Sequence, residues 1–408
     1  MLLRKIVLTA AKMSNVFEYS TKDLIHLTNS WSQDEPFELS QFDEELRKRW
    51  EAAMKNGVFR YDIDHITTRI IPGPKHYVAQ LNLPRAKERR KPQDIRSINQ
   101  PFNGSEFNFT WVDQKEVVFY LKRKNCQSAL RKCETVEDGI HDGAQQVDSE
   151  DGFEAKQVMY NGMSDSQILS KTDCNRNAVI INVSPMEYGH VLLVPHIDAC
   201  LTQMLTESSI QACLEMILLS KHRGFRIGFN SLCAFASVNH LHFHAYYLEH
   251  ELIIDHCPAQ HLVGGLHEMT AIPVPGFAFQ LHNSTVKDLS RHVYKVSSFF
   301  HKADIAHNLF INRGVVFGEE RHSVNTTVRV FIWPRRKFIG TKSAEEFNVA
   351  SIELAGHLPI REEKGYETLT EECVDAIIAD SQLPHGHYEQ LKQQLVEMFT
   401  PAHSLQES

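Results

Sequence analysis

From residue 239 to residue 247 the chain reads Asn239-His240-Leu241-His242-Phe243-His244-Ala245-Tyr246-Tyr247, with three histidines separated by apolar residues. This alternation is typical of a β-strand, in which successive side chains point to opposite faces. His240, His242 and His244 are therefore expected on one face, with neighbouring histidines about 6.6 Å apart. The intervening apolar residues are expected to pack into the core.

A row of histidines at this spacing suits a phosphate chain that lies along the strand. A neutral imidazole is a good nucleophile at phosphorus and leaves again readily, and near pH 7 its neighbours can serve as acid, base or cation. From the residues alone, three other interpretations stay open. They are chance clustering among 23 histidines, a zinc or copper site, and a buried structural polar seam.

The segments before the histidines predict further strands and a helix. Apolar runs at 177–183, 190–195 and 225–229 predict buried strands. Between the last two, apolar residues recur at helical spacing from Ile210 to Leu218, and Gly224 ends that helix. Strands and a helix in this order predict an α+β fold, in which helices cover one face of a sheet.

Composition divides the chain into five segments. Residues 1–13 are basic and apolar and are interpreted as a leader, and residues 14–122 form an N-terminal part of the catalytic body. Residues 123–155 are polar and poor in large apolar groups, which predicts a mobile linker or insertion. Residues 156–256 are the half that carries the histidines. Residues 257–402 hold a predicted helix at 286–300, a strand at 328–333 and a capping box between Thr368 and Glu371.

Bulk composition excludes several classes of protein. The chain has 408 residues, 42% hydrophobic and 23% charged, and a formal net charge of -8. That charge argues against a general binder of nucleic acid or of anionic membranes. No apolar run approaches the ~18 residues of a membrane span. Eight cysteines without a Cys-x-x-Cys motif favour a reducing compartment, and we expect a cytoplasmic protein.

Longer motifs add a resemblance to a known family. Asn182-x-x-Pro185-x-x-x-Gly189-His190, followed by Asn230-Ser231 and the three histidines, resembles the histidine-triad superfamily. Within it, the stretches 99–109, 228–248, 307–310 and 353–359 are most similar to the GDP-hexose phosphorylases. The resemblance implies a histidine-triad-like antiparallel sheet, built as two related halves like the galactose-1-phosphate uridylyltransferase-like folds. The plant members have glutamine where this chain has His244, which favours GDP-D-glucose over GDP-L-galactose.

The resemblance also implies roles for individual residues. His242 would be the nucleophile, with one ring nitrogen held as N–H by a backbone carbonyl. His240 would orient the strand, and His244 would contact the phosphate or the leaving oxygen. The expected substrate-binding residues are Asn230, Ser231 and Ser237, together with Arg329, which is singled out because a charge inside an apolar strand usually needs a partner. Further basic candidates are Arg89, Arg90, Lys91, Arg313 and Arg335, whereas His190 is interpreted as a core histidine.

The implied reaction converts a GDP-hexose and inorganic phosphate into GDP and a hexose 1-phosphate through guanylated His242. It requires no cofactor and no metal, because histidines and arginines can supply the positive charge. Alternatives are a GDP-sugar hydrolase that releases GMP, a phosphorylase of GDP-L-galactose, and a nucleotide sensor without turnover. The residues leave the oligomeric state open.

Overall fold

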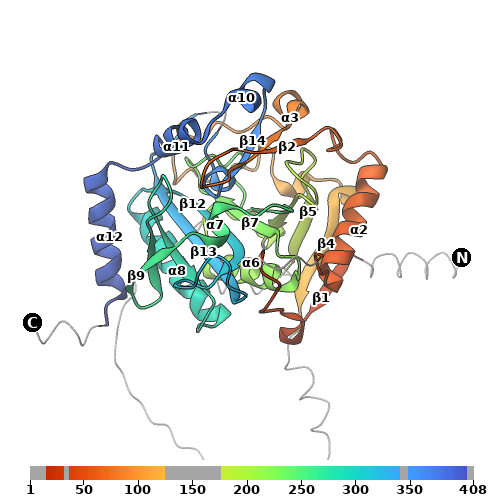
Figure 1. The fold of residues 1–408 in the computed structure, drawn as a ribbon. Coiled ribbons are helices and arrows are strands. Elements are labelled where there is room, and N and C mark those ends of the chain that lie inside the picture. The colour runs from red at the N-terminus through yellow and green to blue at the C-terminus, as the bar shows by residue number, and fades with distance from the viewer. Residues whose placement is uncertain (1–14, 32–35, 125–175, 341–347, 402–408) are drawn as a thin grey trace, which may run out of the picture.

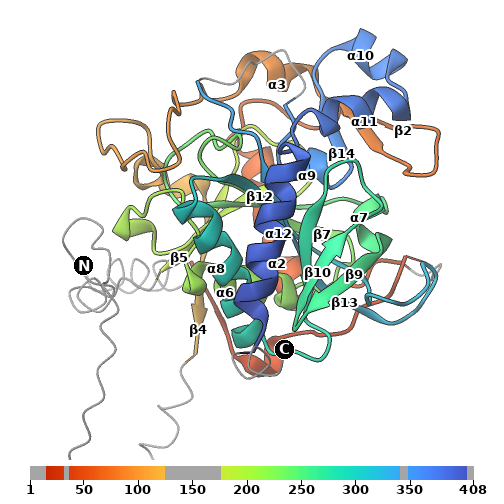
Figure 2. The same ribbon diagram turned by 90° about the vertical axis from the view of Figure 1, so that its left-hand side faces the viewer.

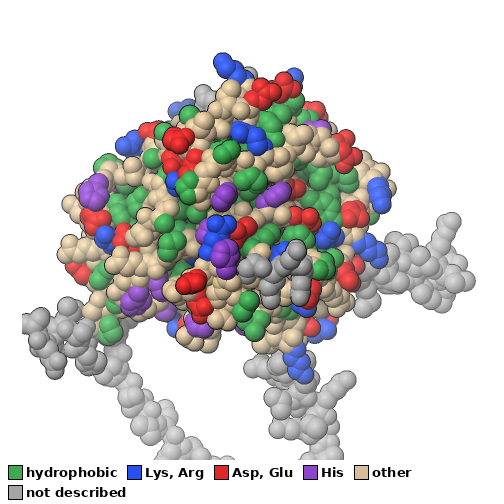
Figure 3. All heavy atoms as spheres, in the orientation of Figure 1, with side chains coloured by type: hydrophobic (Ala, Val, Ile, Leu, Met, Phe, Trp, Pro, Cys, Tyr) green, Lys and Arg blue, Asp and Glu red, His purple; other side chains and the backbone are tan. Residues whose placement is uncertain are grey.

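The computed structural model describes residues 15–31, 36–124, 176–340 and 348–401. The predicted leader at 1–13 and the predicted linker beyond residue 124 lie outside these ranges. Within the described residues, no helix has both the length and the apolar character that crossing a membrane requires. On the face drawn in Figure 3, basic and acidic side chains are interspersed rather than gathered into one charged region.

One large sheet forms the centre of the molecule (Figure 1). All neighbouring strands run antiparallel except β1 and β4, which are parallel. In spatial order the strands are β1 (Val16–Tyr19), β4 (Val117–Arg123), β5 (Asn177–Ile181), β6 (Val191–Val194), β8 (Phe243–Tyr247), β7 (Phe225–Asn230), β12 (Ala306–Val315), β13 (Thr326–Arg335), β11 (Gly276–Gln280), β10 (Leu266–Met269) and β9 (Ala259–Val263).

The order of these strands divides the sheet into two halves of the same topology. In the first half, β4, β5, β6, β8 and β7 lie side by side, and helix α6 (Glu207–Leu219) connects β6 to β7. In the second half, β9, β10, β11, β13 and β12 repeat that order, and α8 (Val286–Lys302) connects β11 to β12. The halves meet where β7 pairs with β12, with Asn230 opposite Asn308. The prediction of an α+β fold with two related halves is confirmed.

Helices cover one face of the sheet, with α6 and α8 packed over its middle (Figure 2). At the two ends lie α2 (Gln41–Lys55), next to β4, and α12 (His385–Phe399), next to β9 (Figure 1). The predicted helical stripe of α6 is buried, and the side chain of its N-cap residue Thr206 accepts a bond from the backbone of Ser209. Gly224 must be glycine, because a side chain there would collide with the carbonyl oxygen of Leu248.

A small second sheet lies over the opposite face. Its strands, in order, are β14 (His357–Ile360), β3 (Val78–Leu81) and β2 (Thr67–Ile70), with β14 and β3 parallel. In Figure 1 it lies at the top of the molecule with the short helices of the same region. These are α3 (Leu83–Glu88), α10 (Glu363–Thr368) and α11 (Glu371–Ala379), while α7 (Ile253–His256) and α9 (Ser351–Leu354) pack against β12.

The histidine segment alternates between the two faces of the large sheet, as predicted. Leu241, Phe243 and Ala245 belong to the core beneath the helices, whereas Tyr246 packs into the core of the opposite face. His244 therefore points away from α6 and α8.

Two details differ from the prediction. Strand β8 begins only at Phe243, so His240 and His242 lie in an irregular segment before it. The expected capping box is also wrong, because Thr370 rather than Thr368 caps helix α11 and accepts from the backbone of Cys373. Glu371 instead accepts a bond from the backbone of Lys75 at 2.8 Å, since α11 packs against that turn.

Candidate active site

A cavity opens on the face of the sheet that α6 and α8 leave uncovered. His242 and His244 line it together with Asn230 and Ser237, four of the residues expected at the site. Other walls come from the segment 348–353 of the second half. The cavity therefore combines the histidine segment with parts of both halves.

His242 is held in one tautomer. Its Nδ1 lies 2.7 Å from the carbonyl oxygen of His240. A carbonyl can only accept, so Nδ1 carries the proton and the neutral ring keeps its lone pair on Nε2. The Phe109 ring lies against His242, with ring centroids 4.9 Å apart. This is the arrangement of a nitrogen nucleophile.

Gln203 replaces the strand partner that His242 lacks. Its Oε1 accepts from the backbone N–H of His242 at 2.9 Å, and its Nε2 donates to the carbonyl oxygen of His242 at 3.1 Å. The same Nε2 donates to the carbonyl oxygen of Asn230 at 2.9 Å. Asn239 holds Gln203 in turn, because its Oδ1 accepts from the backbone N–H of Gln203 at 3.0 Å. Both side chains are buried.

His240 lies behind His242 and is not among the residues that line the cavity. Its Nδ1 accepts from the backbone N–H of Phe109 at 3.1 Å. Burial, reinforced by the nearby His242, lowers the pKa of His240 to about 4, so its ring is neutral near pH 7. These contacts fit the expectation that His240 orients the segment.

His190 orients His244. The backbone N–H of Met186 donates to Nδ1 of His190 at 3.0 Å, so the proton of the neutral His190 ring is on Nε2. That Nε2 lies 3.0 Å from Nδ1 of His244, to which it donates in this tautomer, and 3.2 Å from Nδ2 of Asn182. His244 consequently carries its own proton on Nε2. Burial lowers the pKa of His190 well below its ordinary value, so the His190 ring is neutral near pH 7. His190 is buried, as expected of a core histidine, but it also touches a cavity residue.

Three arginines, Arg85, Arg89 and Arg361, line another part of the cavity. Burial, followed by the charge of Arg85, lowers the pKa of Arg89 to about 10. Burial and then the charges of Arg85 and Arg89 lower the pKa of Arg361 to about 10. Cations that repel one another in a partly desolvated cavity form a site for a strongly anionic ligand.

The cluster contains one expected cation and two that the sequence did not single out. Arg89 was a candidate from the basic loop, and its neighbour Arg90 also lines the cavity, whereas Lys91 does not. Arg361 directly follows β14, and Arg85 lies in the first turn of α3 after β3. Because β14 and β3 are parallel, both arginines emerge at the same edge of the small sheet. The sequence signal that could have identified Arg85 and Arg361 is their position after two strand-like segments.

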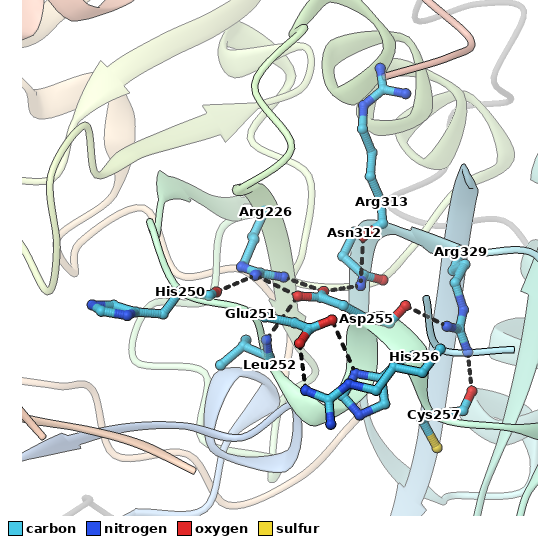
Figure 4. Close-up of polar contacts among 11 residues, drawn as sticks. Arg226, His250, Glu251, Leu252, Asp255, His256, Cys257, Asn312, Arg313 and Arg329 are labelled. Carbon is cyan, nitrogen blue, oxygen red and sulfur yellow. Dashed lines mark hydrogen bonds and ion pairs between the residues drawn. The ribbon is translucent and has the colours of Figure 1, made fainter. Parts of the chain in front are cut away.

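Two expected binding residues lie elsewhere. Ser231 is buried, and its hydroxyl donates to the carbonyl oxygen of Leu232 and accepts from the backbone of His307. Arg329 donates to the carbonyl oxygens of Asp255, at 2.8 Å, and Cys257 (Figure 4). Neither lines the cavity, so the structure gives no support to a role for Ser231 or Arg329 in substrate binding. Arg329 is buried in an apolar strand because its partners are backbone carbonyls on α7 and just beyond it.

The side chains of two other basic candidates also form hydrogen bonds within the protein. Arg313 donates to several backbone carbonyls, including that of Ser220 at 2.9 Å. Arg335 donates to Oδ1 of Asn308 at 3.0 Å, and Asn308 in turn donates to Oδ1 of Asn230 at 2.7 Å. Oδ1 of Asn230 also accepts from the backbone of Ser351 at 2.9 Å. Asn230 therefore presents its amide nitrogen as the remaining polar group of its side chain.

Only the first half carries the histidines. In the second half, β13 occupies the place of β8, and the side chains on the corresponding face are those of Arg329, Phe331 and Trp333. Within the described residues, no group of three or more His, Cys, Asp and Glu side chains is arranged to hold a metal ion.

Two family models match this chain over most of its length. The model described as GDPGP1-like, N-terminal domain, matches residues 41–140 and 153–246, and the GDPGP1-like C-terminal domain matches residues 250–402. The chain belongs to the GDPGP1-like family.

Curated relatives of this GDPGP1-like chain carry phosphorylase names. "GDP-D-glucose phosphorylase 1" of Xenopus laevis is 38% identical over 93% of this chain and 95% of the relative. The Homo sapiens protein of that name is 36% identical over 94% of this chain and 92% of the relative. "GDP-L-galactose phosphorylase 2" of Arabidopsis thaliana is 30% identical over 84% of this chain and 73% of the relative.

A solved structure supports the fold. Yeast Ap4A phosphorylase Apa2 in complex with Ap4A superposes with a TM-score of 0.50, at 14% sequence identity, over 86% of this chain and all of that chain.

The two matched domains of this GDPGP1-like chain meet beside a buried ion pair. Arg226 of β7 forms two hydrogen bonds with Asp255, at 2.6 and 2.8 Å, and both side chains are almost fully buried. Asn312 of β12 donates to the same carboxylate at 2.6 Å, and Arg329 of β13 holds the backbone of Asp255 (Figure 4). The segment between β8 and β9, which joins the two halves of the sheet, is thus bonded to strands of both halves.

Proposed function

We propose that this chain is a GDP-D-glucose phosphorylase, which converts GDP-D-glucose and inorganic phosphate into GDP and glucose 1-phosphate. The observation that carries the proposal is the tautomer of His242. Its Nδ1–H is bonded to the carbonyl of His240, so Nε2 holds the lone pair beside a cavity that four arginines line. The match to the GDP-D-glucose phosphorylases over more than nine-tenths of the chain supports the same reaction.

The first step is attack of Nε2 of His242 on the α-phosphorus of GDP-D-glucose. A P–N bond forms, and the bond between the α-phosphorus and the bridging oxygen breaks, so glucose 1-phosphate leaves with that electron pair. His244 carries its proton on Nε2 through its bond to His190 and donates a hydrogen bond to a phosphate oxygen. Arg85, Arg89 and Arg361 stabilise the negative charge that moves onto the leaving phosphate.

The second step replaces that leaving group with inorganic phosphate. An oxygen of phosphate attacks the guanylated His242, the P–N bond breaks, and its electron pair returns to Nε2. GDP is released. Cations that held the phosphate of glucose 1-phosphate can hold inorganic phosphate in the same place, which favours phosphate over water by proximity.

Product analysis with GDP-D-glucose, with and without phosphate, tests the proposal. Without phosphate we expect about one equivalent of glucose 1-phosphate in a burst, then slow release of GMP as water attacks the adduct. With phosphate, the nucleotide product should change from GMP to GDP and turnover should rise. GMP as the sole nucleotide at millimolar phosphate would instead identify a hydrolase. Comparison of kcat/KM with GDP-L-galactose decides between the two hexoses.

A further inference from the structure

The cavity has an apolar end and a cationic end. Phe109, Ile180 and Leu192 line the apolar end, and they belong to one core cluster against which Phe107 and Val112 also pack. The Phe107 and Phe109 rings have centroids 5.8 Å apart, and Phe109 contacts His242. The charge of Arg85 acts on His190, which places the cationic end next to the His190–His244 pair instead.

This division fixes how a nucleoside diphosphate hexose fits. With its α-phosphorus at Nε2 of His242, the leaving phosphate reaches the arginines. The flat, largely apolar base then lies at the aromatic end, where burial of its faces is favourable.

The apolar end contains one carboxylate and one guanidinium. Glu116, the last residue of the 3₁₀ turn Gln114–Glu116, lines the cavity, and so does Arg90. Their charges interact, and the Arg90 guanidinium carbon lies 3.4 Å from the centroid of the Phe107 ring. One oxygen of Glu116 accepts from the backbone N–H of Asp113 at 3.2 Å, which fixes the carboxylate at the wall.

The second lining carboxylate, Glu353, is in a different position. It accepts from the backbone N–H of Ala350 at 2.9 Å and its charge acts on Arg361 and Arg335. Glu353 thus belongs to the cationic end, and Glu116 is the carboxylate placed for a base.

A carboxylate and a guanidinium together match guanine. Its N1–H and N2–H2 groups are two adjacent donors, which a carboxylate accepts side by side, and its O6 is an acceptor for a guanidinium. Adenine offers an unprotonated N1 where guanine has N1–H, so a carboxylate would face a lone pair.

We propose that Glu116 recognises the N1–H and N2–H2 edge of guanine, with Arg90 at O6, and so determines base specificity. The assignment rests on the proposed function, in which the base is the guanine of a GDP-hexose. It makes Glu116 a specificity-determining residue on a segment that precedes the histidines by more than one hundred residues.

Calorimetric binding of GDP and IDP tests this assignment without turnover. The hypoxanthine of IDP keeps N1–H and O6 but lacks the N2 amine. The wild-type protein should bind GDP about tenfold to hundredfold more tightly than IDP. Glu116→Gln keeps an oxygen that can accept from the backbone N–H of Asp113. It also places the glutamine NH2 group, a donor, against the N2 amine of guanine, which is a donor too. Its preference for GDP over IDP should fall to near one, while Glu88→Gln, an exposed control on α3, should keep it.

A second variant separates the two contacts. Arg90→Leu removes the group at O6, which both bases share, so affinity for GDP and IDP should fall by the same factor and their ratio should stay. A folded Glu116→Gln protein with the wild-type ratio would overturn the assignment, and so would a wild-type protein that binds IDP or ADP as well as GDP. Guanine selectivity that depends on Glu116, combined with failure of phosphorolysis, would contradict the proposed function alone.

Discussion

Gln203 forms hydrogen bonds with both backbone polar groups of His242, accepting at 2.9 Å and donating at 3.1 Å. The backbone N–H and carbonyl of His242 are thereby satisfied without a neighbouring strand, and the His242 ring packs against Phe109. Placement of Nε2 thus depends on a side chain from the loop before α6.

Gln203→Leu should therefore lower kcat by about ten- to hundredfold, since a misplacement near 1 Å costs about that much. KM for GDP-D-glucose should change little, because the groups that contact its phosphates remain. Steady-state kinetics measure both, and Gln211→Leu is the matched control, since Gln211 is a half-buried glutamine of α6 that donates to Glu215 and does not line the cavity. If Gln203→Leu changed kcat and KM no more than Gln211→Leu does, the proposed role of Gln203 would be contradicted.

His242→Asn should lower turnover by on the order of 10⁴ or more, as loss of a covalent nucleophile does. Asparagine is close in size to the ring up to Nδ1, so it can keep the bond to the carbonyl of His240. Acid-quenched mass spectrometry with GDP-D-glucose should show the guanylated wild-type protein and no adduct on the variant. His387→Asn, on the exposed start of α12, is the control. A folded His242→Asn protein with a tenth of the activity would exclude this nucleophile.

Arg361→Gln should affect ligand-free stability and ligand binding in opposite directions. The charges of Arg85 and Arg89 oppose that of Arg361, so its removal should leave Tm unchanged or higher when no ligand is bound. The increase in Tm that saturating GDP produces should become smaller, because ligand stabilisation scales with affinity. Thermal melts with and without GDP measure both effects. A variant with lower Tm and a full response to GDP would show that Arg361 supports the fold rather than the anion.

Stability should fall as the solution becomes acidic. Burial lowers the pKa of His240 and His307 to about 4, and that of His222 and His357 to about 3. These rings are neutral in the folded protein, whereas the unfolded chain takes up protons near pH 6.5. The unfolded state therefore binds more protons below pH 6.5, and the free energy of unfolding decreases from there toward pH 4.

Urea denaturation at several values between pH 5 and pH 7 measures that slope. His307→Gln should reduce it by about one proton, or ~1.4 kcal/mol per pH unit at its steepest. The exposed His387→Gln should leave it unchanged. A slope that does not respond to His307 would show that other groups cause the acid sensitivity.

Local patterns predicted those features that depend on neighbours in sequence. Alternation placed Leu241, Phe243 and Ala245 in the core, and the resemblance carried the carbonyl contact of His242, which the structure contains. The start of β8 was wrong, because the alternation does not reveal that Gln203 replaces a strand partner.

The sequence could not predict contacts between residues that lie far apart in the chain. A charge in the apolar strand β13 indicated that Arg329 needs a partner, but its acceptors lie more than seventy residues away. The pairing that places Arg361 near Arg85 joins strands almost three hundred residues apart. No local sequence pattern predicts the pairing of strands that are so far apart in the chain.

The buried Arg226–Asp255 pair has a mechanical consequence. To swing the second half away from the first, the protein would have to break the pairing of β7 with β12. It would also have to separate two ions that lie out of water, at a cost of several kcal/mol, or break the bonds of Asn312 and Arg329 to Asp255. A hinge at the connection between the halves is therefore unfavourable. We expect substrate entry and product release to proceed without rotation of one half against the other.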